Sequence, residues 1–257
     1  MPAAPKQAFH HGQGSKGPSI PTVLVLGGSG VIGSAVCLRF AQHGWNVGVH
    51  YHANHDSAAA VLQKIEQLGR EGRSFQADMS DSRQIHALFD QAQTVWPEFD
   101  ALVWSVGTTV NRLTVRITPS EWEQILHTNL TGLFLCLQRG LRLFSERRGG
   151  TVTVMSSLSS ARGGTGQAAY AACKAGTLGL VKSAAREFGD ANVRVNAIFP
   201  GWHRSPLAGD AFPGPDQRHA HVLGRTPALD DVTDFIYRLT TTRGISGQVY
   251  NMDNRIW

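Results

Sequence analysis

A β-type apolar run at residues 22–26 enters a glycine-rich segment, Gly27-Gly-Ser-Gly30-Val-Ile-Gly33, and a helical pattern follows over residues 34–43. Glycines in such a segment allow a tight turn and let the backbone approach a pyrophosphate, which sits at the positive end of the helix dipole. The order of strand, glycine turn and helix therefore predicts the first βαβ unit of an open α/β sheet with a dinucleotide site. A flexible glycine turn between an ordinary strand and helix is the alternative interpretation.

The alternation of strand and helix patterns continues along the chain. Further β-type runs lie at 46–51, 73–77, 100–107, 151–156, 193–199 and 248–252, and helical patterns at 57–69, 82–95, 119–127, 130–147, 167–188 and 230–242. Such alternation predicts a parallel sheet with helices on both faces, a single doubly wound, Rossmann-like α/β domain over residues 21–257. Residues 1–20 are polar and rich in Gly and Pro, which is typical of a flexible leader.

Composition argues against several other classes of protein. The net charge of +5 is scattered along the chain rather than gathered in a stripe, so we do not expect nucleic-acid binding. Cys37, Cys136 and Cys173 lie in apolar helical patterns, as expected for buried thiols in a reducing compartment. Because the apolar runs are too short to span a bilayer and the amino terminus lacks a signal-peptide core, we expect a cytoplasmic protein without a membrane segment.

Three histidines at the end of the second β-type run invite a metal-site interpretation. Of His50, His52 and His55, only the first two share a face of a strand, and no set of carboxylates or thiolates completes the ligands. We therefore expect no metal and interpret these side chains as solvated or hydrogen-bonding.

Tyr170 and Lys174 are spaced four residues apart in the Ala-rich helical pattern at 167–188, so they lie on one face of the helix. A free tyrosine has a pKa of about 10, and a nearby ammonium lowers it toward the working range of an acid–base catalyst. Ser157 follows a β-type run and offers a hydroxyl to a substrate carbonyl. The pair taken alone is also consistent with a simple surface contact on a helix.

Several candidate residues follow the ends of β-type runs, where cofactors bind in such folds. They are the glycine turn, Asp78, Gly107, Ser157 and the dipeptide Pro200-Gly201. Asp78 is placed to receive an adenine amino group. The loop at 51–55 holds Tyr51 and Asn54 but no carboxylate until Asp56, and a carboxylate is what usually holds the ribose 2′-hydroxyl of NAD. The loop therefore favours NADP over NAD, although it contains no Arg or Lys.

Together these residues resemble the short-chain dehydrogenase/reductase family over residues 22–253, and in particular its compact branch that contains 3-oxoacyl-carrier-protein reductases. The resemblance implies that Tyr170 is the general acid that protonates a carbonyl as hydride arrives, and that Ser157 orients this carbonyl. It implies that Lys174 lowers the Tyr170 pKa and holds the nicotinamide ribose, and that Asn129 anchors a proton-relaying water. The cofactor positions that it implies are Gly27, Ser29, Gly30, Val31, Ile32, Tyr51, Asn54, Asp78, Met79, Ser105, Gly107, Tyr170, Lys174, Pro200, Gly201 and Ser205.

The chain departs from the family pattern at three places. Val31 stands at the middle glycine position of the turn, with Gly30 one residue earlier. Residues 104–107 read Trp-Ser-Val-Gly where Asn-Asn-Ala-Gly is usual, and the substrate loop at 202–221 matches poorly. These departures affect the adenosine side of the pocket and the identity of the substrate.

The leading hypothesis is an NADP(H)-dependent oxidoreductase that reduces a small carbonyl substrate, including a 3-oxoacyl thioester on a carrier, to an alcohol. The alternative is a catalytically weak NADP-binding regulatory or scaffold protein. Arg162, Arg204 and Arg112 are candidates for contact with an anionic substrate, or are ordinary surface residues. Apolar faces in 121–145 and 167–188, together with the family resemblance, predict a homodimer or homotetramer.

Overall fold

The computed structural model of the chain describes residues 20–209, 212–214 and 220–256. Within them, seven strands form one sheet in the order β3-β2-β1-β4-β5-β6-β7, and every neighbouring pair is parallel. The strands are β1 Thr22–Leu26, β2 Asn46–Tyr51, β3 Gly72–Gln76, β4 Ala101–Trp104, β5 Gly150–Met155, β6 Val193–Phe199 and β7 Val249–Asn251. The predicted doubly wound sheet is confirmed, and its order reverses between β1 and β4. The predicted leader, except for Ile20, lies outside the described residues.

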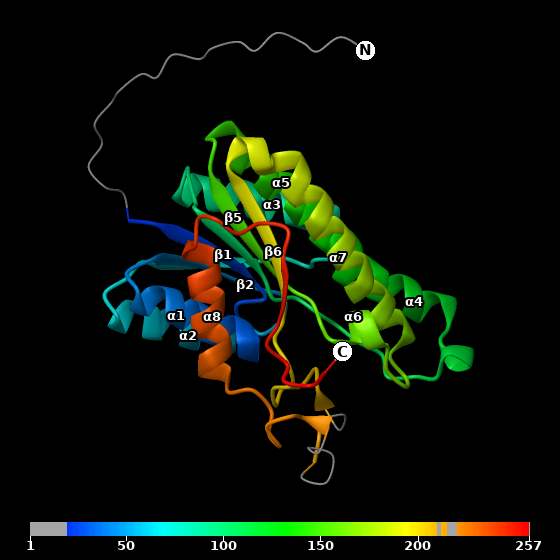
Figure 1. The fold of residues 1–257 in the computed structure, drawn as a ribbon. Helices are drawn as coiled ribbons and strands as arrows, with labels where there is room; N and C mark the ends of the chain where they lie inside the picture. Colours follow the sequence, from blue (N-terminus) through cyan, green and yellow to red (C-terminus); the bar gives the residue numbers. More distant parts are fainter. Residues whose placement is uncertain (1–19, 210–211, 215–219, 257) are drawn as a thin grey trace, which may run out of the picture.

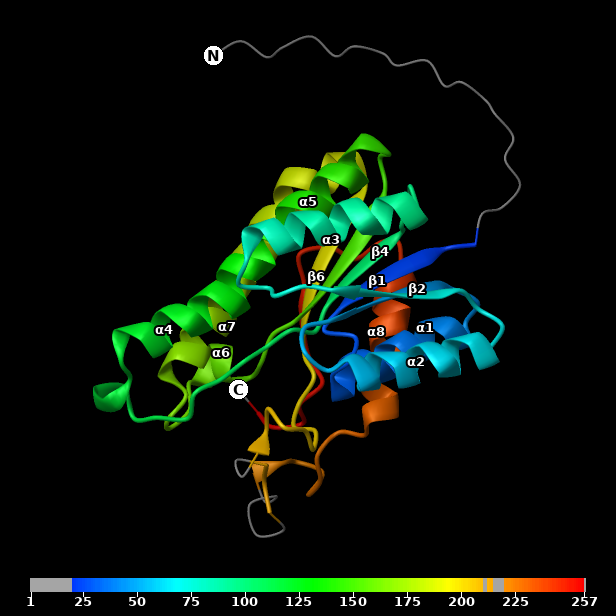
Figure 2. The same ribbon diagram turned by 180° about the vertical axis from the view of Figure 1, so that it is seen from behind.

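Helices cover both faces of the sheet. Figure 1 shows α1 (Val31–Gln42), α2 (His55–Gln67) and α8 (Leu229–Thr241) on one face, and Figure 2 shows α3 (Ser82–Val95) and α5 (Gly132–Glu146) on the other. The long helix α7 (Ala168–Phe188) packs beside α5. The alternation of side chains along β1 explains the two layers. Val23 and Val25 join the core under α1, α2 and α8, whereas Leu24 and Leu26 join the core under α3, α5 and α7.

The boundaries differ from the predicted ones where loop residues take part in helices. Gly30 is the N-cap of α1, and the helix begins at Val31. The end of the glycine segment therefore forms the first turn of α1. Between α4 (Pro119–Leu126) and α5, the chain forms a π-helical turn over His127–Thr131. The sequence patterns do not predict the short helix α6 (Ser159–Arg162). They also do not predict the short 3-10 turns at Thr114–Arg116 and Gly189–Ala191.

None of the helices in the described part of the chain combines the length and the apolar character that a bilayer crossing requires.

Candidate active site

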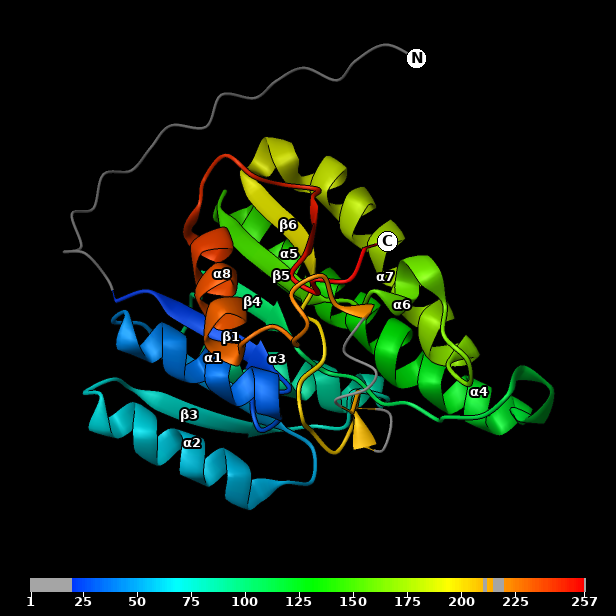
Figure 3. The same ribbon diagram turned by 60° about the horizontal axis from the view of Figure 1, so that its bottom comes forward.

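The carboxyl ends of β1, β4, β5 and β6 meet around one pocket, and Figure 3 brings this edge of the sheet forward. The pocket has a volume of about 470 Å³. Six predicted site residues line it: Ile32, Ser157, Tyr170, Pro200, Gly201 and Ser205. Tyr51, Asn54 and Asp78 lie at the ends of the more distant strands β2 and β3. The predicted residues thus follow one edge of the sheet, as an extended dinucleotide requires.

The glycine turn has the close contacts that its residue types predict. Gly27 has φ +83°, and a Cβ atom there would lie 2.8 Å from the carbonyl carbon and oxygen of Ser105. A Cβ atom on Gly33 would lie 2.0 Å from the carbonyl oxygen of Gly27, so only glycine fits. The position of the family's middle glycine is Val31, which is the first residue of α1, and Gly30 precedes it as the N-cap.

The amino-terminal end of α1 fits a phosphate group. Within the described residues, no side chain caps this end, and its first turn contains no acidic residue. The backbone N–H groups at the start of a helix, together with the helix dipole, attract an anion. These features fit the predicted dinucleotide.

His50 has a structural role at this edge that the sequence pattern does not specify. It is 2% exposed and bridges two strand ends. Its Nδ1 atom accepts a hydrogen bond from the Gly27 N–H (2.8 Å), and its Nε2 atom lies 3.0 Å from the Ala77 carbonyl oxygen. The ring is therefore the neutral tautomer with the proton on Nε2, and burial lowers its pKa to about 4. The hydrogen-bonding interpretation is correct for His50, and the described residues contain no cluster of metal-ligating side chains.

Protonation of His50 is expected to destabilise the protein in acid. The pKa is about 4 in the folded protein and 6.5 ordinarily, so the unfolded chain binds the proton more readily. Above pH 6.5 the ring is neutral in both states, and its hydrogen bonds contribute fully to the free energy of unfolding. This contribution, about 3 kcal/mol, is lost as the pH falls through the folded-state pKa of about 4. We therefore expect the difference in unfolding free energy between the wild type and His50→Asn to shrink from pH 7 to pH 4, as measured by urea denaturation.

The same substitution at His55, whose side chain is 70% exposed, is the control for loss of an imidazole elsewhere. A constant difference between wild type and His50→Asn across this pH range would contradict the assigned tautomer and its hydrogen bonds.

Lys174 is buried behind the pocket and held in place by the backbone. Its Nζ atom donates a hydrogen bond to the Met155 carbonyl (2.8 Å) and lies 5.6 Å from the centroid of the Tyr170 ring. The hydroxyl of Ser156 donates to the Lys174 carbonyl (3.0 Å), which attaches α7 to the end of β5. Burial lowers the pKa of Lys174 to about 8. The predicted pairing of ring and ammonium on one helix face is present.

Ser157 lines the same pocket as Tyr170 and begins a chain of hydroxyl groups. Its Oγ atom donates a hydrogen bond to Ser159 Oγ (3.1 Å), which in turn donates to Gln167 (3.0 Å). Burial raises the Tyr170 pKa to about 12, and the neighbouring Ser157 hydroxyl acts on the pKa in the opposite direction. The predicted lowering of this pKa by Lys174 is therefore wrong for this arrangement, because desolvation of the phenol outweighs its neighbours.

Asn129 is fully buried in the π-helical turn and clamps the loop after β4. Its side-chain amide donates to the Thr108 carbonyl (2.7 Å) and accepts from the Thr108 N–H (2.8 Å). A Cβ atom on Gly107 would lie 3.7 Å from Asn129 Oδ1 and 3.9 Å from Lys174 Nζ, so these two side chains meet beside Gly107. The part that Asn129 plays in a proton relay stays a prediction.

The remaining predicted cofactor residues have varied contacts. Asn54 caps α2 through a hydrogen bond from the Ser57 N–H (3.2 Å), and Asp78 accepts two hydrogen bonds from Ser80 (both 2.8 Å). Met79 is buried in the core, 3.8 Å from the sulfur of Cys136. Ser105 donates its N–H to the Leu26 carbonyl (2.8 Å), Ser29 lies in the glycine turn, and Ser205 accepts from the Ala208 N–H (3.2 Å).

Trp104 belongs to the core rather than to the cofactor cleft. It is 1% exposed and pairs in register with Leu26 of β1 and Val154 of β5. The change from Asn-Asn-Ala-Gly therefore places a large side chain under α3 and α5, where Trp104 packs in the same core cluster as Met79 and Leu133.

Residues near the carboxyl terminus also line the pocket, among them Asp253 and Arg255. Residues 202–203, which follow β6, line it too. Neither of these two groups of residues repeats with the period of a helix or a strand. The carboxyl-terminal residues reach the pocket because the chain continues to it after β7.

Comparison with known proteins identifies the family. The model of the short chain dehydrogenase family matches residues 21–215. The chain belongs to the short-chain dehydrogenase family. Accordingly, it is an oxidoreductase of this type, and the predicted resemblance is confirmed.

Individual relatives agree with the family assignment. The chain is 36% identical over 181 residues to the 3-oxoacyl-[acyl-carrier-protein] reductase FabG of Staphylococcus aureus, covering 70% of this chain and 74% of the relative. It is 30% identical over 233 residues to the 3-oxoacyl-[acyl-carrier-protein] reductase of Synechocystis, covering 90% and 94%.

Two solved structures share the fold. A Burkholderia xenovorans protein described as a short-chain dehydrogenase/reductase has a TM-score of 0.83 at 28% identity, covering 93% of this chain and 98% of that one. A variant of the actinorhodin polyketide ketoreductase, with NADPH, has a TM-score of 0.85 at 22% identity, covering 91% and 96%.

Proposed function

We propose that this protein reduces a carbonyl group to an alcohol with NADPH, and that Tyr170 donates the proton. The main support is that Ser157 and Tyr170 line the same pocket at the strand ends, with the Lys174 ammonium 5.6 Å from the centroid of the phenol ring. When bound, the cofactor supplies the hydride, and the protein supplies orientation and the proton.

The glycine turn, the start of α1 and the loop at 200–201 would hold the cofactor. Ile32 and Pro200 line the same pocket as Tyr170, so this end of the site receives the nicotinamide. The Ser157 and Tyr170 hydroxyls are two donors for one carbonyl oxygen, which stabilise negative charge as it develops there. Because the Tyr170 pKa is about 12, the phenol is protonated at neutral pH and ready to donate. After the proton leaves, the Lys174 ammonium, 5.6 Å from the ring centroid, offsets part of the negative charge on the phenolate.

Two 3-oxoacyl-carrier-protein reductases among the relatives support a 3-oxoacyl thioester as one substrate class. The experiment is a panel of ketones and 3-oxoacyl thioesters with NADPH, followed by loss of NADPH absorbance. Oxidation with at least one carbonyl compound supports a reductase. Binding of NADPH with no oxidation across the panel would favour the binding or scaffold protein instead.

NADPH is expected to be preferred over NADH by about tenfold or more in kcat/KM, equivalent to about 1.4 kcal/mol. The end of β2 presents Tyr51 rather than a carboxylate, so a 2′-phosphate meets no negative charge from that residue. Tyr51→Asp is expected to reverse the order, and Tyr51→Asn is the uncharged control. Steady-state kinetics with both cofactors measure it, and a wild-type preference for NADH would contradict this assignment.

Assembly into a homodimer or homotetramer stays a prediction. Trp122 of α4 and Phe134 of α5 are 39% and 46% exposed, which supports a contact between copies of the chain on these helices.

A further inference from the structure

The wall of the pocket contains an arginine whose position is set by a buried carboxylate. Arg255 lines the pocket, and Asp253, only 2% exposed, binds it through both carboxylate oxygens. The Arg255 Nε atom donates to Asp253 Oδ1 (2.8 Å), and its Nη2 atom pairs with the second oxygen. A guanidinium has five N–H donors, so an ion pair through two of its nitrogens leaves donors for further hydrogen bonds.

The chain around Arg255 is itself fastened to the rest of the fold. The side chain of Asn251 donates to the Arg255 carbonyl (3.1 Å) and accepts from the Asp253 N–H (2.9 Å). His221, 3% exposed, lies 2.8 Å from the side-chain oxygen of Asn254. The guanidinium also lies 5.7 Å from the centre of the Trp202 ring. Arg255 is therefore preorganised, which lowers the entropic cost of binding a ligand.

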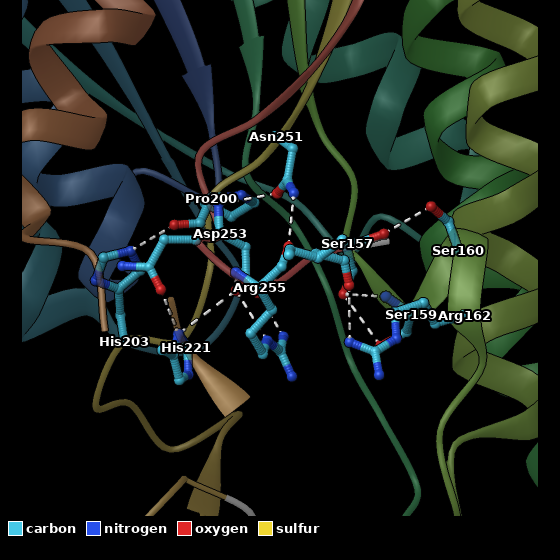
Figure 4. Close-up of polar contacts among 12 residues, drawn as sticks. Ser157, Ser159, Ser160, Arg162, Pro200, His203, His221, Asn251, Asp253 and Arg255 are labelled. Carbon is cyan, nitrogen blue, oxygen red and sulfur yellow. Dashed lines mark hydrogen bonds and ion pairs between the residues drawn. The ribbon is translucent and has the colours of Figure 1, made fainter. Parts of the chain in front are cut away.

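A second arginine lines the pocket from α6. Arg162 donates from Nη1 to the carbonyl of Ile256 (3.1 Å), next to Arg255 in sequence. Figure 4 shows Arg255 between Asp253 and His221 on one side and Ser157, Ser159 and Arg162 on the other. Arg162 and Arg255 therefore line the same pocket as Ser157.

The charges in the pocket do not cancel. Asp253 offsets Arg255, and burial lowers the pKa of His203, the pocket's histidine, so its ring stays neutral at pH 7. Over the described ranges, Arg162 forms no ion pair with a carboxylate. The other two arginine candidates differ. Arg112 pairs with Glu121 (3.1 Å), and Arg204 stacks on Phe212 (4.6 Å).

We propose that Arg162 and Arg255 bind a carboxylate on the carbonyl substrate, so that the protein prefers oxo acids to neutral ketones. Guanidinium groups bind carboxylates through paired, charge-assisted hydrogen bonds. Because both arginines and the Ser157–Tyr170 pair line one pocket of about 470 Å³, the carboxylate and the reacting carbonyl belong to one short molecule or acyl group. This inference rests on the proposed function, since it places the carbonyl at Tyr170.

The test is calorimetric binding of acetoacetate and levulinate, each against its methyl ester, to the protein saturated with NADP⁺, which cannot reduce them. At least one acid is expected to bind about tenfold or more tightly than its ester. Arg162→Gln is expected to remove most of that preference and to leave binding of the ester unchanged. Arg204→Gln, on the neighbouring loop, is the matched control and should keep the preference.

Arg255 is best tested together with its partner. Arg255→Gln alone leaves the buried Asp253 without its cation, which can destabilise the fold. The double variant Asp253→Asn/Arg255→Gln removes both charges, and thermal unfolding shows whether it folds. A folded double variant is expected to lose the preference for the acid. If it unfolds, Arg162→Gln alone decides the proposal.

The outcomes separate this inference from the proposed function. Equal binding of acid and ester by the wild type, or equal loss in Arg204→Gln and Arg162→Gln, would overturn the carboxylate site. NADPH oxidation with ketones of both kinds at equal kcat/KM would also overturn it while supporting the reductase. A preference for the acid in binding, with no NADPH oxidation by any carbonyl compound, would support the carboxylate site and refute reduction.

Discussion

Tyr170→Phe is expected to lower the rate of carbonyl reduction by about a thousandfold while NADPH still binds, within the range found for loss of a positioned acid. Phenylalanine keeps the ring beside Lys174 and removes only the hydroxyl of a residue that lines the pocket with Ser157. Single-turnover loss of NADPH absorbance measures the rate, and quenching of protein fluorescence measures binding.

Tyr237→Phe is the matched control for this change. Tyr237 lies on α8 against Phe40 and His43, among the residues of the opposite core layer. Its variant should reduce carbonyl compounds at the wild-type rate. Equal rates in wild type and Tyr170→Phe would refute the assigned proton donor, and loss of both activity and NADPH binding would show a structural role instead.

Gly33→Ala is expected to weaken NADPH binding by about a hundredfold and to lower the unfolding free energy by about 1–3 kcal/mol, the usual cost of overpacking. The new methyl group would lie 2.0 Å from the Gly27 carbonyl oxygen, so the turn that we propose to face the pyrophosphate must move. Calorimetric titration with NADPH and urea denaturation measure the two effects.

Gly179→Ala provides a control with the same added atom. Gly179 lies on the exposed face of α7, and a Cβ atom there meets no described atom within 4 Å. Alanine should stabilise the helix by about 0.5–1 kcal/mol and leave NADPH binding unchanged. Wild-type affinity for NADPH in Gly33→Ala would contradict a cofactor turn at this site.

The order of elements was predictable because the apolar side chains repeat with the period of each element. All five residues of β1 are buried, and the alternate ones serve opposite layers, which is what a strand covered on both faces requires. The i, i+4 spacing likewise predicted that Lys174 lies beside the Tyr170 ring. Local rules of this kind need no knowledge of distant partners.

Burial and contacts distant in sequence were not predictable in this way. His50 bonds groups 23 and 27 residues away, so its role depends on the register of three strands. The Tyr170 pKa follows from how far the folded chain desolvates the phenol rather than from the helix spacing. Arg255 reaches the pocket only because Asp253 and Asn251 shape the segment after β7. The same limit applies to Trp104, whose place in the core depends on its register with β1 and β5.

The central claim is that a carbonyl oxygen, held by the Ser157 and Tyr170 hydroxyls, faces a nicotinamide at the ends of β1, β4, β5 and β6. A crystal structure of the complex with NADP⁺ and an unreactive alcohol product tests this most directly. We predict the product oxygen within hydrogen-bond distance of Tyr170 Oη and the nicotinamide beside Ile32 and Pro200. A nicotinamide outside this pocket, or a product oxygen bound away from Tyr170, would contradict it.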